Sequence, residues 1–113
     1  MNIVNKTKDK VLAKDILIPQ TLKEKSLGLL REESPRGMYV KTRWGLHTGG
    51  MNFAIDIIIA DKNMKVRKIL RNVGSGRIVF WSPLFNNVFE LPAGTVKDTG
   101  TEFFDKIKLE KQS

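Results

Sequence analysis

Residues 46–61 read Leu-His-Thr-Gly-Gly-Met-Asn-Phe-Ala-Ile-Asp-Ile-Ile-Ile-Ala-Asp. From residue 53 to residue 60, seven of eight residues are apolar and four are β-branched. This composition predicts a strand that is covered on both faces. Period-2 alternation gives the strand one face with Phe53, Ile55, Ile57 and Ile59, and another with Ala54, Asp56, Ile58 and Ala60.

Asp56 is the charged residue inside this strand. A buried carboxylate without a partner is costly, so we expect either a structural partner or a cleft where the group does chemistry. If Gly49-Gly50 forms a two-residue hairpin, the cross-strand partner of Asp56 is Arg43. Alternatively, backbone amides of a loop could donate hydrogen bonds to the carboxylate of Asp56.

The same stretch carries a family resemblance. His47-Thr48, Gly50-Met51, Phe53 and Ile55-Asp56, followed by Glu90-Leu91-Pro92-Ala93-Gly94, resemble the prokaryotic family called domain of unknown function 192, over roughly residues 12–109. The resemblance implies a small β-rich single domain. It also implies a binding site at the positions where its motifs fall, namely His47, Thr48, Met51, Asp56, Glu90, Pro92 and Gly94.

Length and composition predict one domain over residues 1–113, with residues 1–10 frayed or pairing at an edge. The chain has no cysteine and one histidine, so we expect no disulfide, no metal and no cofactor. Its longest aliphatic run is too short for a spanning helix, and its start shows no apolar signal region. We therefore expect a soluble cytoplasmic protein with no membrane partner.

The remaining pattern predicts a mainly β, α+β fold, a small antiparallel barrel or sandwich of six to seven short strands and one short helix. The helix is expected over Leu22–Leu30, after a capping box at Thr21 and Glu24. A tight hairpin is expected at 61–63. Strands are expected within 11–18 and at 38–41, 64–70, 78–81, 87–91 and 103–109.

Basic residues outnumber acidic ones by 20 to 12, giving a formal charge of +8. Between residues 62 and 89 there are six basic residues and no acidic one. If Lys65, Arg67, Arg71 and Arg77 form one exposed stripe, they provide a phosphate-binding surface with Trp81 or Trp44 for stacking bases. The alternative is a solvated surface whose aromatic residues belong to the core.

These features favour a non-catalytic binding or accessory module, whose ligand is an unknown small molecule or acidic partner. An alternative is a hydrolase that acts on a sugar-like or phosphorylated small molecule with Asp56, Glu90 and His47, because paired carboxylates can divide acid and base roles. A second alternative is a non-specific nucleic-acid binder that uses the basic segment 62–89.

Overall fold

The computed structural model describes residues 1–18, 37–41, 45–47 and 53–111. Within these residues the chain forms nine strands and one short helix. The elements are β1 (Asn2–Asn5), β2 (Lys10–Ala13), β3 (Met38–Lys41), β4 (Gly45–His47), β5 (Ile55–Ala60), β6 (Val66–Val73), β7 (Ile78–Phe80), β8 (Asn87–Pro92), α2 (Thr95–Thr99) and β9 (Ile107–Glu110).

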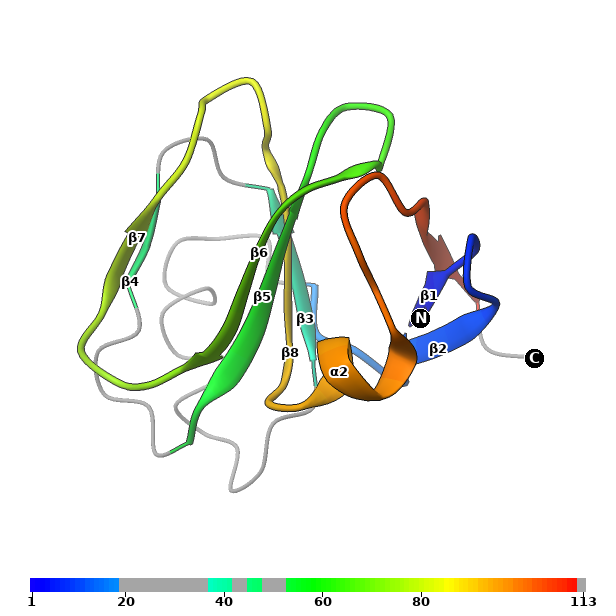
Figure 1. Ribbon diagram of the computed structural model, residues 1–113, viewed down its shortest axis with the longest axis horizontal. Helices are drawn as coiled ribbons and strands as arrows, with labels where there is room; N and C mark the ends of the chain where they lie inside the picture. The colour runs from blue at the N-terminus through cyan, green and yellow to red at the C-terminus, as the bar shows by residue number, and fades with distance from the viewer. Residues whose placement is uncertain (19–36, 42–44, 48–52, 112–113) are drawn as a thin grey trace.

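The strands form three antiparallel sheets, with the four-stranded sheet β3-β8-β5-β6 in the middle. On one side of it lie the three-stranded sheet β2-β1-β9 and α2, and on the other side lies the ribbon of β4 and β7 (Figure 1). The prediction of a mainly β, antiparallel fold is confirmed. Among the described strands the four-stranded sheet ends at β3 and β6 and does not close on itself, so the layers form a sandwich rather than a barrel.

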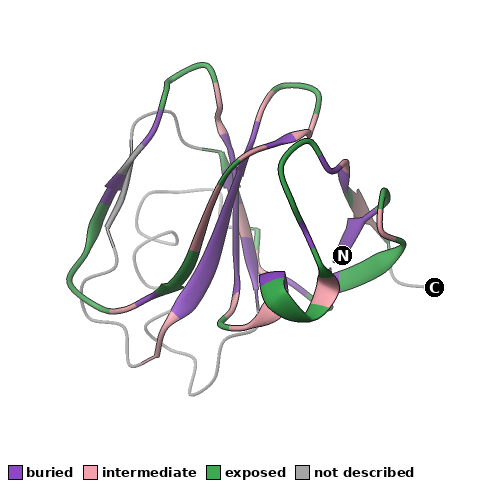
Figure 2. Cartoon of the chain, viewed as in Figure 1, coloured by how far each residue is buried: buried purple, intermediate pink, exposed green. Residues whose placement is uncertain are grey.

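Two hydrophobic cores lie on the two faces of the four-stranded sheet. The first core contains Ile58 and Ala60 of β5 with residues of β1, β2, β9 and α2, and the second contains Ile55, Ile57 and Ile59 with residues of β3 and β7. Every residue of β5 is buried, as its uninterrupted purple colour in Figure 2 shows. The predicted strand covered on both faces, with these alternating sets, is therefore confirmed.

The predicted hairpin after β5 is also confirmed. The amide of Met64 donates to the carbonyl of Asp61 at 2.9 Å, and the amide of Asp61 donates to the carbonyl of Lys65 at 3.0 Å. Its returning strand, expected over 64–70, occupies Val66–Val73 instead. The β5–β6 register shifts at two places. The shift between Ile59 and Ala60 leaves Val66 facing the first core and Leu70 facing the second, although alternation predicts one face for both.

The two ends of the chain differ from expectation. Residues 2–5, placed by the sequence in a frayed or edge-pairing terminus, form the middle strand of the three-stranded sheet. The predicted strand 103–109 begins only at Ile107, because 103–104 form a turn in which Phe104 has a φ of 71°. Neither β4 nor α2 was expected, and the predicted helix at 22–30 lies outside the described residues.

No helix in the described ranges is long and apolar enough to cross a membrane.

Candidate functional site

The carboxylate of Asp56 is held by three backbone amides. Its Oδ1 accepts a hydrogen bond from the amide of Asn72 at 2.9 Å, and its Oδ2 accepts from Gly94 at 3.1 Å and Val96 at 2.9 Å. The residue is 1% exposed. Three donors satisfy both oxygens, which is how a carboxylate is kept inside a protein without an arginine partner.

Local backbone irregularities aim these amides at Asp56. Opposite Asp56, strand β6 carries a bulge between Leu70 and Val73, where Asn72 adopts a φ of 52° and turns its amide out of the ladder. Gly94, with a φ of 95°, precedes α2 and offers no side chain to cap it. Asp56 therefore serves as the N-terminal cap of α2 from a distant strand, accepting from the amide of the preceding Gly94 and from that of Val96 in the first turn.

Glu90, unlike Asp56, is a buried carboxyl group with an oxygen that no hydrogen bond satisfies among the described residues. It is 2% exposed in the middle of β8, and its Oε2 is buried without a hydrogen-bond partner in the described part of the chain. Burial raises the pKa of Glu90 from its ordinary 4.5 to about 8. At neutral pH this side chain is consequently a protonated, uncharged acid.

The structure does not bring Asp56 and Glu90 together. Asp56 pairs with Leu91 of the first core, whereas Glu90 pairs with Ile57 of the second core. Because successive side chains of a strand point to opposite faces, the two carboxyl groups lie on opposite sides of the sheet. The turn after β8 does reach Asp56, through the amide of Gly94, while Pro92 pairs with Ile55.

The loop residues of the predicted site are less fully described. His47 ends β4 and pairs with Ile78 of β7. Thr48, Met51 and Arg43 lie outside the described residues. Among the described strands the neighbours of β5 are β8 and β6, and Asp56 is held by backbone amides, which was the other structural expectation; the expected pairing with Arg43 falls outside the described residues.

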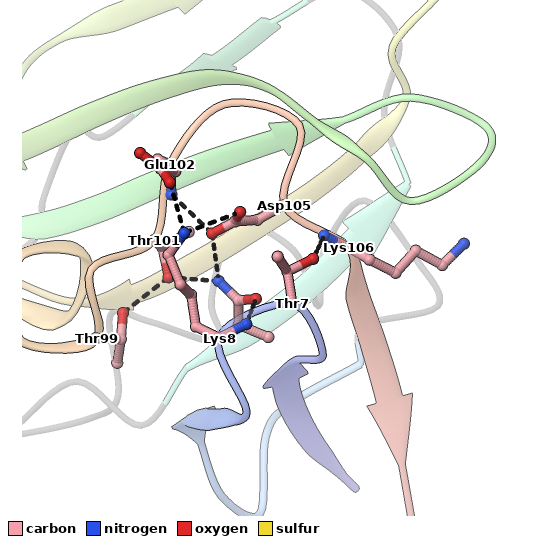
Figure 3. A network of polar contacts seen from close by, with 8 residues as sticks. Thr7, Lys8, Thr99, Thr101, Glu102, Asp105 and Lys106 are labelled. Carbon is pink, nitrogen blue, oxygen red and sulfur yellow. Dashed lines mark hydrogen bonds and ion pairs between the residues drawn. The ribbon is translucent and has the colours of Figure 1, made fainter.

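A second buried polar group was not anticipated from the sequence. The Asn5 side-chain amide donates to Thr101 Oγ1 at 3.0 Å and to Asp105 Oδ2 at 2.9 Å, and all three residues are buried. Figure 3 shows the polar contacts around Thr101 and Asp105. The Asn5 side chain also accepts from the amide of Lys8 at 3.0 Å. This polar network joins the β1–β2 hairpin to the turn before β9.

Asp105 is the charged centre of the polar network. Burial acts to raise its pKa, but hydrogen bonds from Asn5, the Glu102 amide and Lys8 outweigh it and leave the pKa below the ordinary 3.8. Lys8 also pairs with Glu102, so its one ammonium group lies between two carboxylates. The role of the polar network is to hold the turn in place.

That turn presents the most unusual surface group of the described chain. The guanidinium of Arg67 lies over three phenylalanine rings, 4.7 Å from the centroid of Phe85, 5.7 Å from Phe103 and 5.3 Å from Phe104. Phe103 and Phe104 are 53% and 55% exposed. We call Arg67, Phe85, Phe103 and Phe104 the aromatic cluster.

The bulge that separates Val66 from Lys68 in the ladder places Arg67 in the aromatic cluster. Arg67 Nη1 pairs with Asp61 Oδ2 at 3.2 Å. Burial acts to raise the pKa of Asp61, but amides of Lys65 and Asn63 and the Arg67 guanidinium hold it below its ordinary value. Asp61 is therefore a charged anchor that fixes the guanidinium beneath the rings.

The predicted basic stripe is interrupted by the same bulges. Lys65 and Arg67 are partly buried, whereas Arg71 and Arg77 are exposed. The register shifts beside Arg67 and Arg71 prevent these side chains from following one period-2 face. Trp81, the expected stacking residue, is 8% exposed and belongs to the second core, and Trp44 lies outside the described residues.

Comparison with known proteins supports the fold. A crystal structure of a protein of unknown function from Novosphingobium aromaticivorans superposes with a TM-score of 0.82 at 18% identity, covering 96% of this chain and 84% of that one. A protein from Sinorhizobium meliloti described as a "putative transcription regulator" superposes with a TM-score of 0.75 at 19% identity, covering 95% and 89%. No protein-family model and no curated protein matches the sequence.

Proposed function

We propose that this protein is a non-catalytic binding module that contacts its partner through the aromatic cluster. The observation that carries the proposal is the pair Phe103 and Phe104, both more than half exposed and backed by the guanidinium of Arg67. Exposed aromatic side chains beside an arginine are enriched where proteins bind partners.

The turn that carries the two rings is held in a fixed conformation. The amide of Phe104 donates to the carbonyl of Val66 at 2.8 Å, and Asp105 is fixed by the buried polar network. Leu84, in the neighbouring turn that carries Phe85, is 78% exposed. Large apolar groups presented on fixed turns lose little conformational entropy when a partner covers them.

Two observations weigh against the hydrolase alternative. Both oxygens of Asp56 are engaged by backbone amides, so the group is already fully used as a cap. Glu90 faces the other side of the sheet, and acid–base work shared between two carboxyl groups requires both to reach one substrate.

The experiment is capture of partners from a lysate of the native host, with identification of bound macromolecules and small molecules by mass spectrometry. The parent protein is compared with the double variant Phe103→Ser, Phe104→Asn, in which asparagine suits the left-handed backbone at residue 104. A matched control is Ile78→Ser, which removes a side chain of β7 that is 62% exposed. The proposal expects a partner that the control retains and the double variant loses.

Membership of the domain of unknown function 192 family is a proposal that rests on the motifs at residues 47–56 and 90–94. We also propose that the protein works in the cytoplasm, since a chain without cysteine suits a reducing compartment.

A further inference from the structure

We propose that the ligand of the aromatic cluster is single-stranded nucleic acid, with bases stacked on Phe103 and Phe104 and phosphates bound by Lys62, Lys65 and Lys106. This inference rests on the proposed function and names the ligand class of the same surface. It differs from the sequence-based hypothesis, which assigned stacking to Trp81 or Trp44.

The two rings suit unpaired bases. Their centroids are 4.2 Å apart and their planes are inclined by 60°, so the rings present differently oriented faces. Each ring is more than half exposed. Stacking on an aromatic face requires a base whose own face is free, which single strands provide and a duplex does not. Stacking also tolerates any base, so the expected binding has little sequence preference.

Three lysines lie on the two segments that meet at this turn, the β5–β6 hairpin and residues 103–106. Lys62 lies in the β5–β6 hairpin, and Lys65 forms a bridge with Lys106, two residues after Phe104. Lys62 is exposed and the other two are partly exposed. Lys62 and Lys65 belong to segment 62–89, which holds six basic residues and no acidic one, and Lys106 adds a further positive charge beside it.

The acidic groups nearby reduce this positive field without reversing it. Arg67 is paired with Asp61, and Lys8 lies between Glu102 and Asp105. Counting these residues with Lys62, Lys65 and Lys106, five basic side chains stand against three acidic ones, which leaves two positive charges in excess. The surface offered to a ligand is therefore aromatic and positive, which complements a chain of bases and phosphates. An acidic protein would use the lysines and Leu84, but it would have no need for two separately inclined ring faces.

The test measures fluorescence anisotropy of labelled oligothymidine and oligouridine of about 15 nucleotides, a typical site length. A duplex of equal length is the comparison, and salt is varied from about 50 to 200 mM. The proteins are the parent, the double variant Phe103→Ser, Phe104→Asn, the single variants Phe103→Leu and Lys62→Gln, and Ile78→Ser as control. Urea unfolding of each variant verifies that it is folded.

The expected result is tighter binding of single strands than of duplex, with affinity falling as salt rises. The double variant should lose about tenfold or more in affinity for single strands with an unchanged salt slope, since it removes stacking and no charge. Phe103→Leu, which keeps an apolar side chain but no ring, should lose part of that affinity. Lys62→Gln should reduce the salt slope while the preference for single strands remains.

Equal affinity for duplex and single strand, or a folded Phe103→Leu variant that binds like the parent, would overturn the inference and indicate general attraction of a basic protein. If oligonucleotides do not bind while the double variant still loses a protein partner in lysate capture, the nucleic-acid inference is wrong and the binding function stands. If capture also finds no partner that depends on Phe103 and Phe104, both proposals fail.

Discussion

Asp56 and Glu90 lie on neighbouring strands one register position apart, yet their carboxyl groups occupy opposite faces of the same sheet. Asp56 is satisfied by amides from two separate segments, and Glu90 Oε2 finds no partner among the described residues. One carboxyl group therefore stabilises the fold as the acceptor of three backbone amides, and the other is tolerated as a neutral acid. This division leads to opposite expectations for their replacement.

Replacing Asp56 with alanine should strongly destabilise the protein. The substitution leaves the amides of Asn72, Gly94 and Val96 without their acceptor, and we expect a loss of about 3 kcal/mol in the free energy of unfolding. Urea unfolding measures it. The control Asp98→Ala removes the same charge from an exposed position of α2 and should cost under about 1 kcal/mol. An Asp56→Ala protein as stable as this control would contradict the capping role.

Glu90 should make the protein less stable as pH rises. Its pKa is 4.5 in ordinary surroundings and about 8 in the fold, so the folded state binds the extra proton between these values. The resulting stability is fully present below pH 4.5 and is lost progressively up to about pH 8, by at most about 1.4 kcal/mol per pH unit.

The variant Glu90→Gln should flatten that dependence, because glutamine has nearly the same shape and does not ionise. Urea unfolding at intervals between about pH 5 and 8 provides the comparison. Glu110→Gln, on the partly exposed strand β9, is the control and should keep the slope of the parent. A parent protein whose stability is independent of pH over this range would show that Glu90 is not held neutral.

Asp105 should produce the reverse behaviour at acid pH. Its folded pKa lies below the ordinary 3.8, so its contribution is present above that value and is lost as pH falls through the folded pKa. Asp105→Asn should lower the free energy of unfolding at neutral pH by about 2 kcal/mol. Its acid-unfolding midpoint should rise by less than that of another variant with the same loss of free energy, because asparagine does not bind a proton when the pH falls. Circular dichroism during acid titration measures both. Identical acid-unfolding profiles for Asp105→Asn and for an equally destabilised Asn5→Ala protein would count against this assignment.

Arg67→Lys should weaken the aromatic cluster although it keeps the charge. Lysine has no planar group to lie over Phe85, Phe103 and Phe104, and we expect a loss of about 1 kcal/mol in the free energy of unfolding. Arg71→Lys, at an exposed position of the same strand, should change stability by less than about 0.5 kcal/mol. Equal effects of the two substitutions would indicate that the guanidinium contacts contribute nothing.

The sequence predicts the central strand well because burial on both faces leaves a direct mark on composition. It cannot predict which groups donate hydrogen bonds to Asp56. Two of these donors are 38 and 40 positions away in the chain, and the left-handed backbone of Gly94 orients them. Those donors also explain why α2 was missed: a five-residue helix capped from another strand carries no local capping signal.

The aromatic cluster was missed for a different reason. Phe103, Asp105 and Ile107 alternate as the inner face of a strand would, but the buried Asp105 is recruited by Asn5 from the other end of the chain. The turn that this contact fixes exposes Phe103 and Phe104 instead of burying them. Bulges in β6 likewise moved Arg67 from a predicted open face to a position beneath the rings.

The most direct test of the binding surface is photo-crosslinking in the native host with p-benzoylphenylalanine in place of Phe103, which keeps an aromatic ring at that position. The same replacement at Ile78, which is also well exposed, is the reference. We expect a discrete adduct from position 103 that is absent from position 78 and is lost when Phe104→Asn and Arg67→Lys are added. No adduct from position 103, or the same adducts from both positions, would contradict a binding function for the aromatic cluster.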